Sequence, residues 1–352
     1  GLIFSNALDL NNGKLPYKEI FIEYGYLTTL IHSIILKIFG NEVLYLQIYT
    51  SLIYSTTLIL VSCLVKKFTN EYLGFLSLIC LILIYPIPLK PWAIYNSYFF
   101  YTLSLVFFLK KKNFTKFISG LFLSFSYLSF TTLYNFILIP LVIIIIFFYL
   151  FFYHKDKLEI LKLIYFISGV LLPIIIFIFY LINLEILNYW VLYQKIPILY
   201  VNEIADKTIL QQIFYYIKEM SINAIINYIV KPHKIFFGII FFITIYFLLN
   251  ELFHKLKKRE KNKNNNDYII ISLFVLALTP HAQVGGLEKY TTSHTLGLIV
   301  ILIFFDNIKS IDFKYFFSTF LIFTVLLIFI NNYTHPEYSS LKIDISNKQY
   351  NY

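Results

Sequence analysis

The sequence predicts an all-α, polytopic integral membrane protein, and its composition and its apolar patterning both indicate this class. Apolar residues make up 59% of the 352 positions and charged residues 14%, against roughly 45 to 50% and about 25% in soluble domains. The apolar residues also form long uninterrupted runs. Because a helix needs about 20 residues to cross a bilayer core, we expect about ten transmembrane helices in a single transmembrane domain.

Each long apolar run predicts one spanning helix. The expected bounds are 44–64, 72–89, 93–109, 117–133, 135–152, 162–183, 235–253, 268–280, 293–305 and 315–331. Two other segments are predicted to be external interfacial helices. The run 26–39 is too short to span and carries His32 and Lys37, and residues 207–230 repeat isoleucine near helical spacing among polar residues.

Lysine placement predicts the orientation of these helices. Five connections between runs hold 17 of the 29 Lys and Arg residues, and helix alternation puts all five on one side. By the positive-inside rule that side is cytoplasmic. Residues 254–267 are then a cytoplasmic basic linker, while 1–43, the large loop 184–234 and the loop 281–292 are external. This distribution explains the net charge of +10 without a nucleic-acid partner.

Reactive groups are expected on the external face. The predicted spans contain essentially no ionisable side chain away from their ends, which disfavours an ion-coupled pump. Carboxylates and cations share the external loops, as a reaction on an anionic lipid would require. Cys63 and Cys80 lie in apolar runs without a metal-ligand pattern. We therefore expect no resident metal site, and a divalent ion as cofactor stays open.

The first forty residues contain the most specific pattern. Gly13, Lys14, Pro16, Tyr17 and Glu19 read as G-K-x-P-Y-x-E, preceded by Gly1, Phe4 and Ala7 at fixed spacing and followed by a run that ends in Phe39-Gly40. This segment resembles the first external loop of the polyprenyl-phosphate-dependent glycosyltransferases of the type C superfamily, which includes protein O-mannosyltransferases and the lipid A aminoarabinose transferase. Glu19 stands where that family has aspartate.

The resemblance implies that sugar is transferred from a polyprenyl-phosphate donor to a glycan, lipid or protein acceptor of the cell envelope, on the external or periplasmic face of the plasma membrane. It makes Gly13, Pro16 and Tyr17 the first-loop motif and Glu19 and Glu23 candidate catalytic carboxylates. Candidate ligands of the donor phosphate are Lys90, His281, Lys289 and His294. The family's first acidic residue and first helix would precede Gly1, so we expect the sequence to begin inside a longer protein.

Other interpretations remain open at this point. Glu19 could form a structural salt bridge with Lys14 or Lys18, Lys90 could be an interfacial anchor beside Trp92, and residues 281–294 could form an ordinary polar loop. The alternative function is a non-catalytic lipid-linked saccharide flippase or an envelope assembly subunit. A flippase should line its spans with polar or cationic groups. An O-antigen polymerase should use external arginines, and the sole arginine, Arg259, is predicted to be cytoplasmic.

Overall fold

The regular structure of this chain is helical wherever the structure describes it. The computed structural model describes residues 2–22, 24–84, 91–131, 157–193, 232–256, 265–283 and 287–334. Within these ranges there is no strand, only an isolated bridge between Pro16 and Ile20. The predicted all-α class is confirmed for these ranges.

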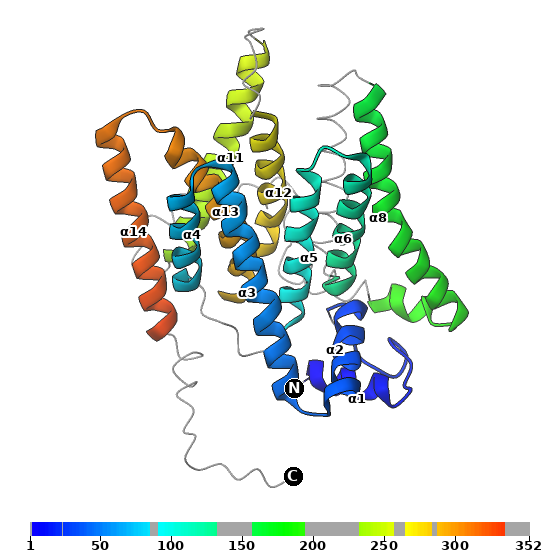
Figure 1. Ribbon diagram of the computed structural model, residues 1–352. Helices are drawn as coiled ribbons and strands as arrows, with labels where there is room; N and C mark the ends of the chain where they lie inside the picture. Colours follow the sequence, from blue (N-terminus) through cyan, green and yellow to red (C-terminus); the bar gives the residue numbers. More distant parts are fainter. Residues whose placement is uncertain are drawn as a thin grey trace, which may run out of the picture.

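The described helices form one short pair and one bundle (Figure 1). The pair is α1 (Leu2–Asn11) and α2 (Tyr26–Phe39), which pack on each other at one end of the bundle beside the start of α3. The bundle helices are α3 (Val43–Phe68), α4 (Glu71–Ile84), α5 (Ala93–Phe108), α6 (Asn113–Ser129), α8 (Lys157–Asn183), α11 (Pro232–Leu256), α12 (Asn265–Gln283), α13 (Leu287–Asn307) and α14 (Ile311–Thr334).

Nine of the ten expected spanning runs overlap described helices, although residues 85–89 and 132–133 of two of these runs lie outside the described residues. The run 135–152 and the segment 207–230 lie wholly outside them. Several helices extend beyond their apolar runs, because polar residues at the ends continue the helical hydrogen bonding. The 281–292 segment, expected as a loop, is largely occupied by the end of α12 and the start of α13. The helix α1 was not expected.

Three described helical segments are long and apolar enough to cross a membrane: Val43–Phe68, Ile160–Asn183 and Ile311–Ile330. Shorter apolar helices of 10 to 17 residues accompany them. The outer faces of α8 and α14 expose large apolar side chains, among them Ile176, Phe179, Ile322 and Phe323. Large contiguous apolar surface of this kind is typical of a lipid-facing wall.

Helices α6 and α8 approach each other through glycine. A Cβ atom built on Gly120 would collide with the backbone oxygen of Phe166, and one built on Gly169 would collide with that of Phe117. On its other side α6 meets α5 through buried serine pairs, in which Ser97 and Ser126 lie 2.9 Å apart. Small residues that allow backbones to approach, with hydroxyls that bond across helices, are typical of membrane helix packing.

The bundle has one end rich in lysine and one end poor in it. The α3–α4, α5–α6 and α13–α14 connections lie at one end with the start of α8 and the end of α11 (Figure 1), and we call this the lysine-rich end. Asp267, near the start of α12, lies among Lys67, Lys111 and Lys116 from two of these connections. The helices α1 and α2 lie at the opposite end. The described connections that contain lysine therefore lie at one end of the bundle, as the alternating direction of successive helices predicted.

Candidate functional site

The first-loop motif forms a compact turn directly after α1. Gly13 has a φ of +81°, in the left-handed region that glycine adopts readily. Tyr17 has a φ of +65°, which is uncommon for a bulky residue. The backbone N–H of Leu15 donates to the Glu19 carboxylate at 2.6 Å, and the N–H of Tyr17 donates to the Ile20 carbonyl at 3.1 Å. The Glu19 carboxylate and several backbone bonds, including those from the Glu19 and Ile20 N–H groups to the Leu15 carbonyl, therefore close the turn.

Burial against the bundle holds Tyr17 in this conformation. Its side chain is 2% exposed and belongs to an apolar cluster with Tyr127 of α6 and Phe177 and Leu181 of α8. The Tyr17 ring also meets Tyr193 edge-on, with 5.6 Å between centroids. Burial raises the pKa of Tyr17, so its hydroxyl stays neutral. The motif tyrosine thus anchors the first loop to α6, α8 and the helical residues 187–193.

A chain of buried hydrogen bonds joins α2 to three bundle helices. The Tyr49 hydroxyl of α3 donates to the side-chain amide oxygen of Asn96, in α5, at 2.7 Å. The Asn96 amide donates to the Thr28 hydroxyl of α2 at 3.2 Å, and Thr28 donates to the Ser129 carbonyl of α6 at 2.9 Å. Because these hydrogen bonds link α2 to α3, α5 and α6, the network fixes the position of α2 at this end.

The segment before α2 lies against the start of α5 and the end of α6. The Tyr24 ring stacks on Phe130 at 5.3 Å between centroids and contacts Trp92 at 5.8 Å. A Cβ atom on Gly25 would lie 2.5 Å from the backbone oxygens of Leu128 and Ser129. Only a glycine leaves room for this approach. Lys90, a predicted phosphate ligand, precedes Trp92 by two positions in the sequence but lies outside the described residues.

Helix α5 also brings the start of α13 to this region. The Tyr98 side chain of α5 faces the Thr295 hydroxyl of α13 and its own helix neighbour Thr102. Tyr98 lies two residues after Asn96, which bonds to α2. The start of α5 therefore stands between the first loop and the first turns of α13.

A fully buried histidine adjoins the polar network. His32 of α2 is 0% exposed, and its ring meets Tyr49 edge-on with 5.9 Å between centroids. Neither ring nitrogen of His32 has a hydrogen-bond partner among the described residues. Burial lowers the pKa of His32 to about 4. The imidazole is therefore neutral at physiological pH.

The predicted site residues of the first loop differ in their exposure and in their bonding partners. Glu19 is exposed, and its described partner is the Leu15 N–H rather than a lysine. Lys14 instead pairs with Asp9 at 2.7 Å. Pro16 is buried. The salt-bridge interpretation of Glu19 with Lys14 or Lys18 thus gains no support from the described part of the chain, while a structural role in the turn does.

For the remaining candidate site residues, either only the backbone is described or the whole residue lies outside the described ranges. Glu23 and Lys90 are outside the described residues. His281 belongs to the last turn of α12, and Lys289 and His294 belong to the first turns of α13, with their side chains outside the description. The start of α13 and the end of α12 lie at the same end of the bundle as α1 and α2 (Figure 1).

Sequence reasoning missed Asn96, Thr28 and Tyr49. The sequence offered little indication of their role, because a single Asn or Thr inside an apolar run does not by itself identify a functional residue. The only available cue was that Asn96 interrupts a spanning segment, where a polar amide needs a partner. The partners come from two distant helices, so their identity required the tertiary structure.

No group of three or more His, Cys, Asp or Glu side chains is positioned to hold a metal ion in the ranges that the structure describes. Comparisons with protein-family models, with curated proteins and with solved structures found no match for this chain.

Proposed function

We propose that this chain is a multi-pass membrane glycosyltransferase that moves a sugar from a polyprenyl-phosphate donor to a cell-envelope acceptor. One observation supports this proposal above the others. The segment that resembles the first external loop of such enzymes packs at the lysine-poor end, against Trp92 two residues beyond Lys90, and the start of α5 links it to the start of α13. The first loop and the start of α13, which both hold candidate site residues, thus lie at the same end of the bundle, and Lys90 precedes α5 in the sequence.

The proposal assigns the lysine-rich end to the cytoplasm and the opposite end to the external face, across about ten spanning helices. A polyprenyl-phosphate donor lies in the membrane with its phosphate at the boundary. A site at the ends of α5, α12 and α13 would meet that phosphate without drawing it into the apolar core, where an unpaired phosphate would be very costly.

In the proposed reaction the acceptor hydroxyl oxygen attacks the anomeric carbon of the donor sugar. The bond from that carbon to the phosphate oxygen breaks, and the lipid phosphate leaves with the bonding electrons. Lys90, His281, Lys289 and His294 would hold the leaving phosphate, because charge-assisted hydrogen bonds stabilise the charge that develops there. A carboxylate, Glu19 or Glu23, would accept the proton of the acceptor hydroxyl.

Glu19 has a structural task as well as this proposed chemical one. Its carboxylate bonds the Leu15 N–H and so closes the motif turn, while the residue remains exposed on the same side as the proposed site. A glutamine at this position keeps an acceptor oxygen for the Leu15 N–H but loses the ability to take a proton. Glu19→Gln therefore separates the two roles.

The donor-phosphate assignment is tested by transfer of labelled sugar from a polyprenyl-phosphate donor in membranes that contain the protein. Lys289→Ala should raise the donor KM by about tenfold, since one charge-assisted hydrogen bond is lost. Lys112→Ala removes an exposed lysine at the lysine-rich end and should leave the KM unchanged. Normal transfer after replacement of Lys90, Lys289 and His294 together would overturn the phosphate site.

The carboxylate assignment is tested in the same assay. Glu19→Gln should lower kcat by about 100-fold or more, as expected for loss of a general base, with little change in donor KM. Glu42→Gln, which changes an exposed carboxylate just before α3, is the matched control and should keep full activity. Unchanged turnover in Glu19→Gln would remove Glu19 from the mechanism. Lipid-linked saccharide translocation without sugar transfer would instead favour the flippase alternative.

A further inference from the structure

A cavity of about 410 Å³ opens at the lysine-rich end, away from the proposed transfer site. It lies between the last turns of α11, the start of α12, the end of α13 and the first turn of α14. Its lining residues are Tyr246, Phe247, Asn250, Tyr268, Ile269, Phe304, Asn307, Ile308, Lys309, Ser310 and Phe313. The cavity is therefore built by four consecutive helices near the end of the described chain.

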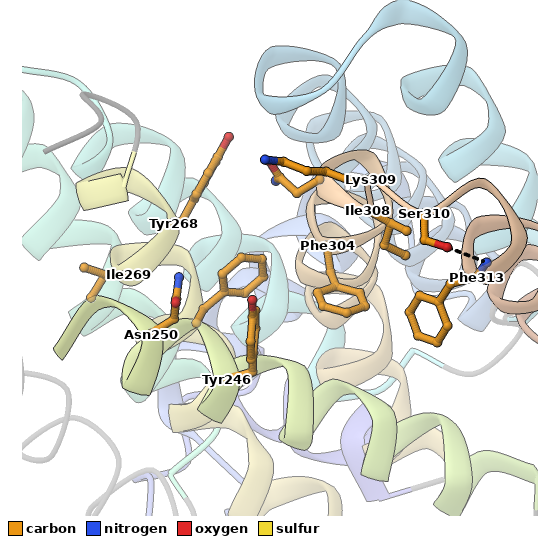
Figure 2. Close-up of a pocket in the computed structure, with 11 residues that line it drawn as sticks. Tyr246, Asn250, Tyr268, Ile269, Phe304, Ile308, Lys309, Ser310 and Phe313 are labelled. Carbon is orange, nitrogen blue, oxygen red and sulfur yellow. Dashed lines mark hydrogen bonds between the residues drawn. The ribbon is translucent and has the colours of Figure 1, made fainter. Parts of the chain in front are cut away.

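The walls of the cavity are aromatic and the mouth is polar (Figure 2). Phe247 and Phe304 face each other edge-on, with 6.3 Å between centroids, and Tyr246 packs against Phe304 at 5.7 Å. Tyr246 and Phe313 remain 51% and 46% exposed. Such open aromatic surface at the ends of apolar helices suits an acyl chain or a glycerol backbone better than water.

Lys309 is the only charged residue among the described lining residues. In Figure 2 its side chain extends over the cavity in the direction of Tyr268. Lys309 forms no ion pair with a described residue. Asp306 and Asp312, its nearest carboxylates in sequence, are exposed and do not line the cavity.

Hydrogen-bond donors surround the same mouth. The Ser310 hydroxyl accepts the Phe313 N–H at 3.4 Å, which leaves its own O–H available to donate. Tyr268 and Asn250 add a hydroxyl and an amide from α12 and α11. One ammonium with several neutral donors is a suitable set for a phosphodiester, whose oxygens only accept.

We propose that this cavity binds the headgroup of an anionic phospholipid from the leaflet at the lysine-rich end. The phosphate would meet Lys309 and the neighbouring donors, and the start of an acyl chain would lie on Tyr246, Phe304 and Phe313. Basic pockets between membrane helices at a lysine-rich boundary are a known physical basis for recognition of anionic lipid. A free phosphate offers the same charge but nothing for the aromatic walls.

The test measures lipid bound to the intact chain in nanodiscs or detergent by native mass spectrometry. The probes are palmitoyl-oleoyl phosphatidylglycerol, the matching phosphatidylcholine, and glycerol 3-phosphate as a soluble competitor. Wild-type protein should bind one phosphatidylglycerol at this site, and Lys309→Gln should weaken that binding by about tenfold. Lys112→Gln, an exposed lysine at the same end outside the cavity, should change it by less than about twofold, as expected for a screened surface charge.

A second variant tests the cavity itself. Phe313→Ser removes one aromatic wall that is already half exposed, so folding should be kept while phosphatidylglycerol binding falls severalfold. Equal binding by wild type and Lys309→Gln would overturn the proposal, and so would equal binding of phosphatidylcholine. Displacement of the lipid by millimolar glycerol 3-phosphate would show a soluble phosphate ligand instead. None of these results depends on sugar transfer, so the experiment tests the lipid site independently of the proposed enzyme activity.

Discussion

At the scale of single residues, His32 has the most unusual environment. It is fully buried beside Tyr49, and its ring nitrogens have no hydrogen-bond partner among the described residues. Buried polar groups in this state lower stability, because their hydration is lost without replacement. Burial also lowers the pKa of His32 to about 4, so protonation of this side chain opposes the folded state.

The first residue-scale prediction is a pH dependence of stability. The unfolded chain protonates His32 near its ordinary pKa of 6.5, whereas the folded chain does so only near 4. Between these values the unfolded state binds more protons, so stability is present above pH 6.5 and is lost as the pH falls toward 4. The full difference corresponds to about 3 kcal/mol. Thermal unfolding of the solubilised protein between pH 7.5 and 4.5 should show this loss.

The variant His32→Leu separates this residue from the other acid-sensitive groups. At pH 7.5 its Tm should equal or exceed that of wild type, since two buried nitrogens are replaced by apolar surface. Between pH 6.5 and 4.5 its Tm should fall less than that of wild type. His335→Leu, after the last described helix, is the control and should follow wild type. Identical acid sensitivity of wild type and His32→Leu would show that His32 does not titrate on unfolding.

At the scale of elements, the α6–α8 contact depends on two glycines. Gly120 and Gly169 each lie against the backbone of the other helix, with no space for a Cβ atom. The Ser124 hydroxyl of α6 also donates to the Val170 carbonyl of α8. Since these two helices carry the tyrosine cluster around Tyr17, their spacing also sets the surface that receives the first loop.

We therefore expect Gly169→Ala to lower stability, although alanine is the better helix former. The added methyl group must move one helix backbone away from the other, and overpacking of this kind typically costs about 1 to 3 kcal/mol. Ser168→Ala, one residue earlier and exposed, should change stability by less than about 0.5 kcal/mol. Chemical or thermal unfolding of the two variants in the same detergent checks both values. A Gly169→Ala protein as stable as wild type would mean that the helices separate without cost.

At the scale of the whole molecule, charge is distributed along the bundle axis. The α3–α4, α5–α6 and α13–α14 connections gather their lysines at one end, where Lys66 also pairs with Glu71 at 2.5 Å. The opposite end holds α1 and α2 and the candidate site. A bundle with this asymmetry has one favoured orientation in a membrane, because basic loops are retained in the cytoplasm.

The prediction at this scale is topological. A cysteine introduced at Lys261, in the basic linker, should be inaccessible to a membrane-impermeant thiol reagent added from outside intact cells. A cysteine introduced at Asn202, in the 184–234 loop, should be labelled. Both variants are made with Cys63 and Cys80 replaced by serine, so that only the new thiol reacts. Labelling at Lys261 but not at Asn202 would reverse the orientation and move the proposed transfer site to the cytoplasmic face.

The sequence by itself determined the helical class, most helix positions and the grouping of lysines at one end. These properties follow from local quantities, namely the length of each apolar run and the charge of each connection, and nine of the ten expected runs overlap described helices. The helix α1 was missed because its ten residues are too few to stand out as an apolar run, and the helical ends of the 281–292 segment were missed because polar residues there continue the helices.

Only the tertiary structure decided which residues meet. Asn96 forms hydrogen bonds with Tyr49 and Thr28, and Tyr17 packs against α6 and α8. Lys309 lines a cavity together with aromatic rings of α11 and α13. Most of these contacts join residues that lie from about fifty to more than a hundred positions apart in the sequence, and hydropathy carries no information on which faces pack together. The physical reason is that apolar burial is non-directional, whereas hydrogen bonds and cavities depend on the particular geometry of the packed helices.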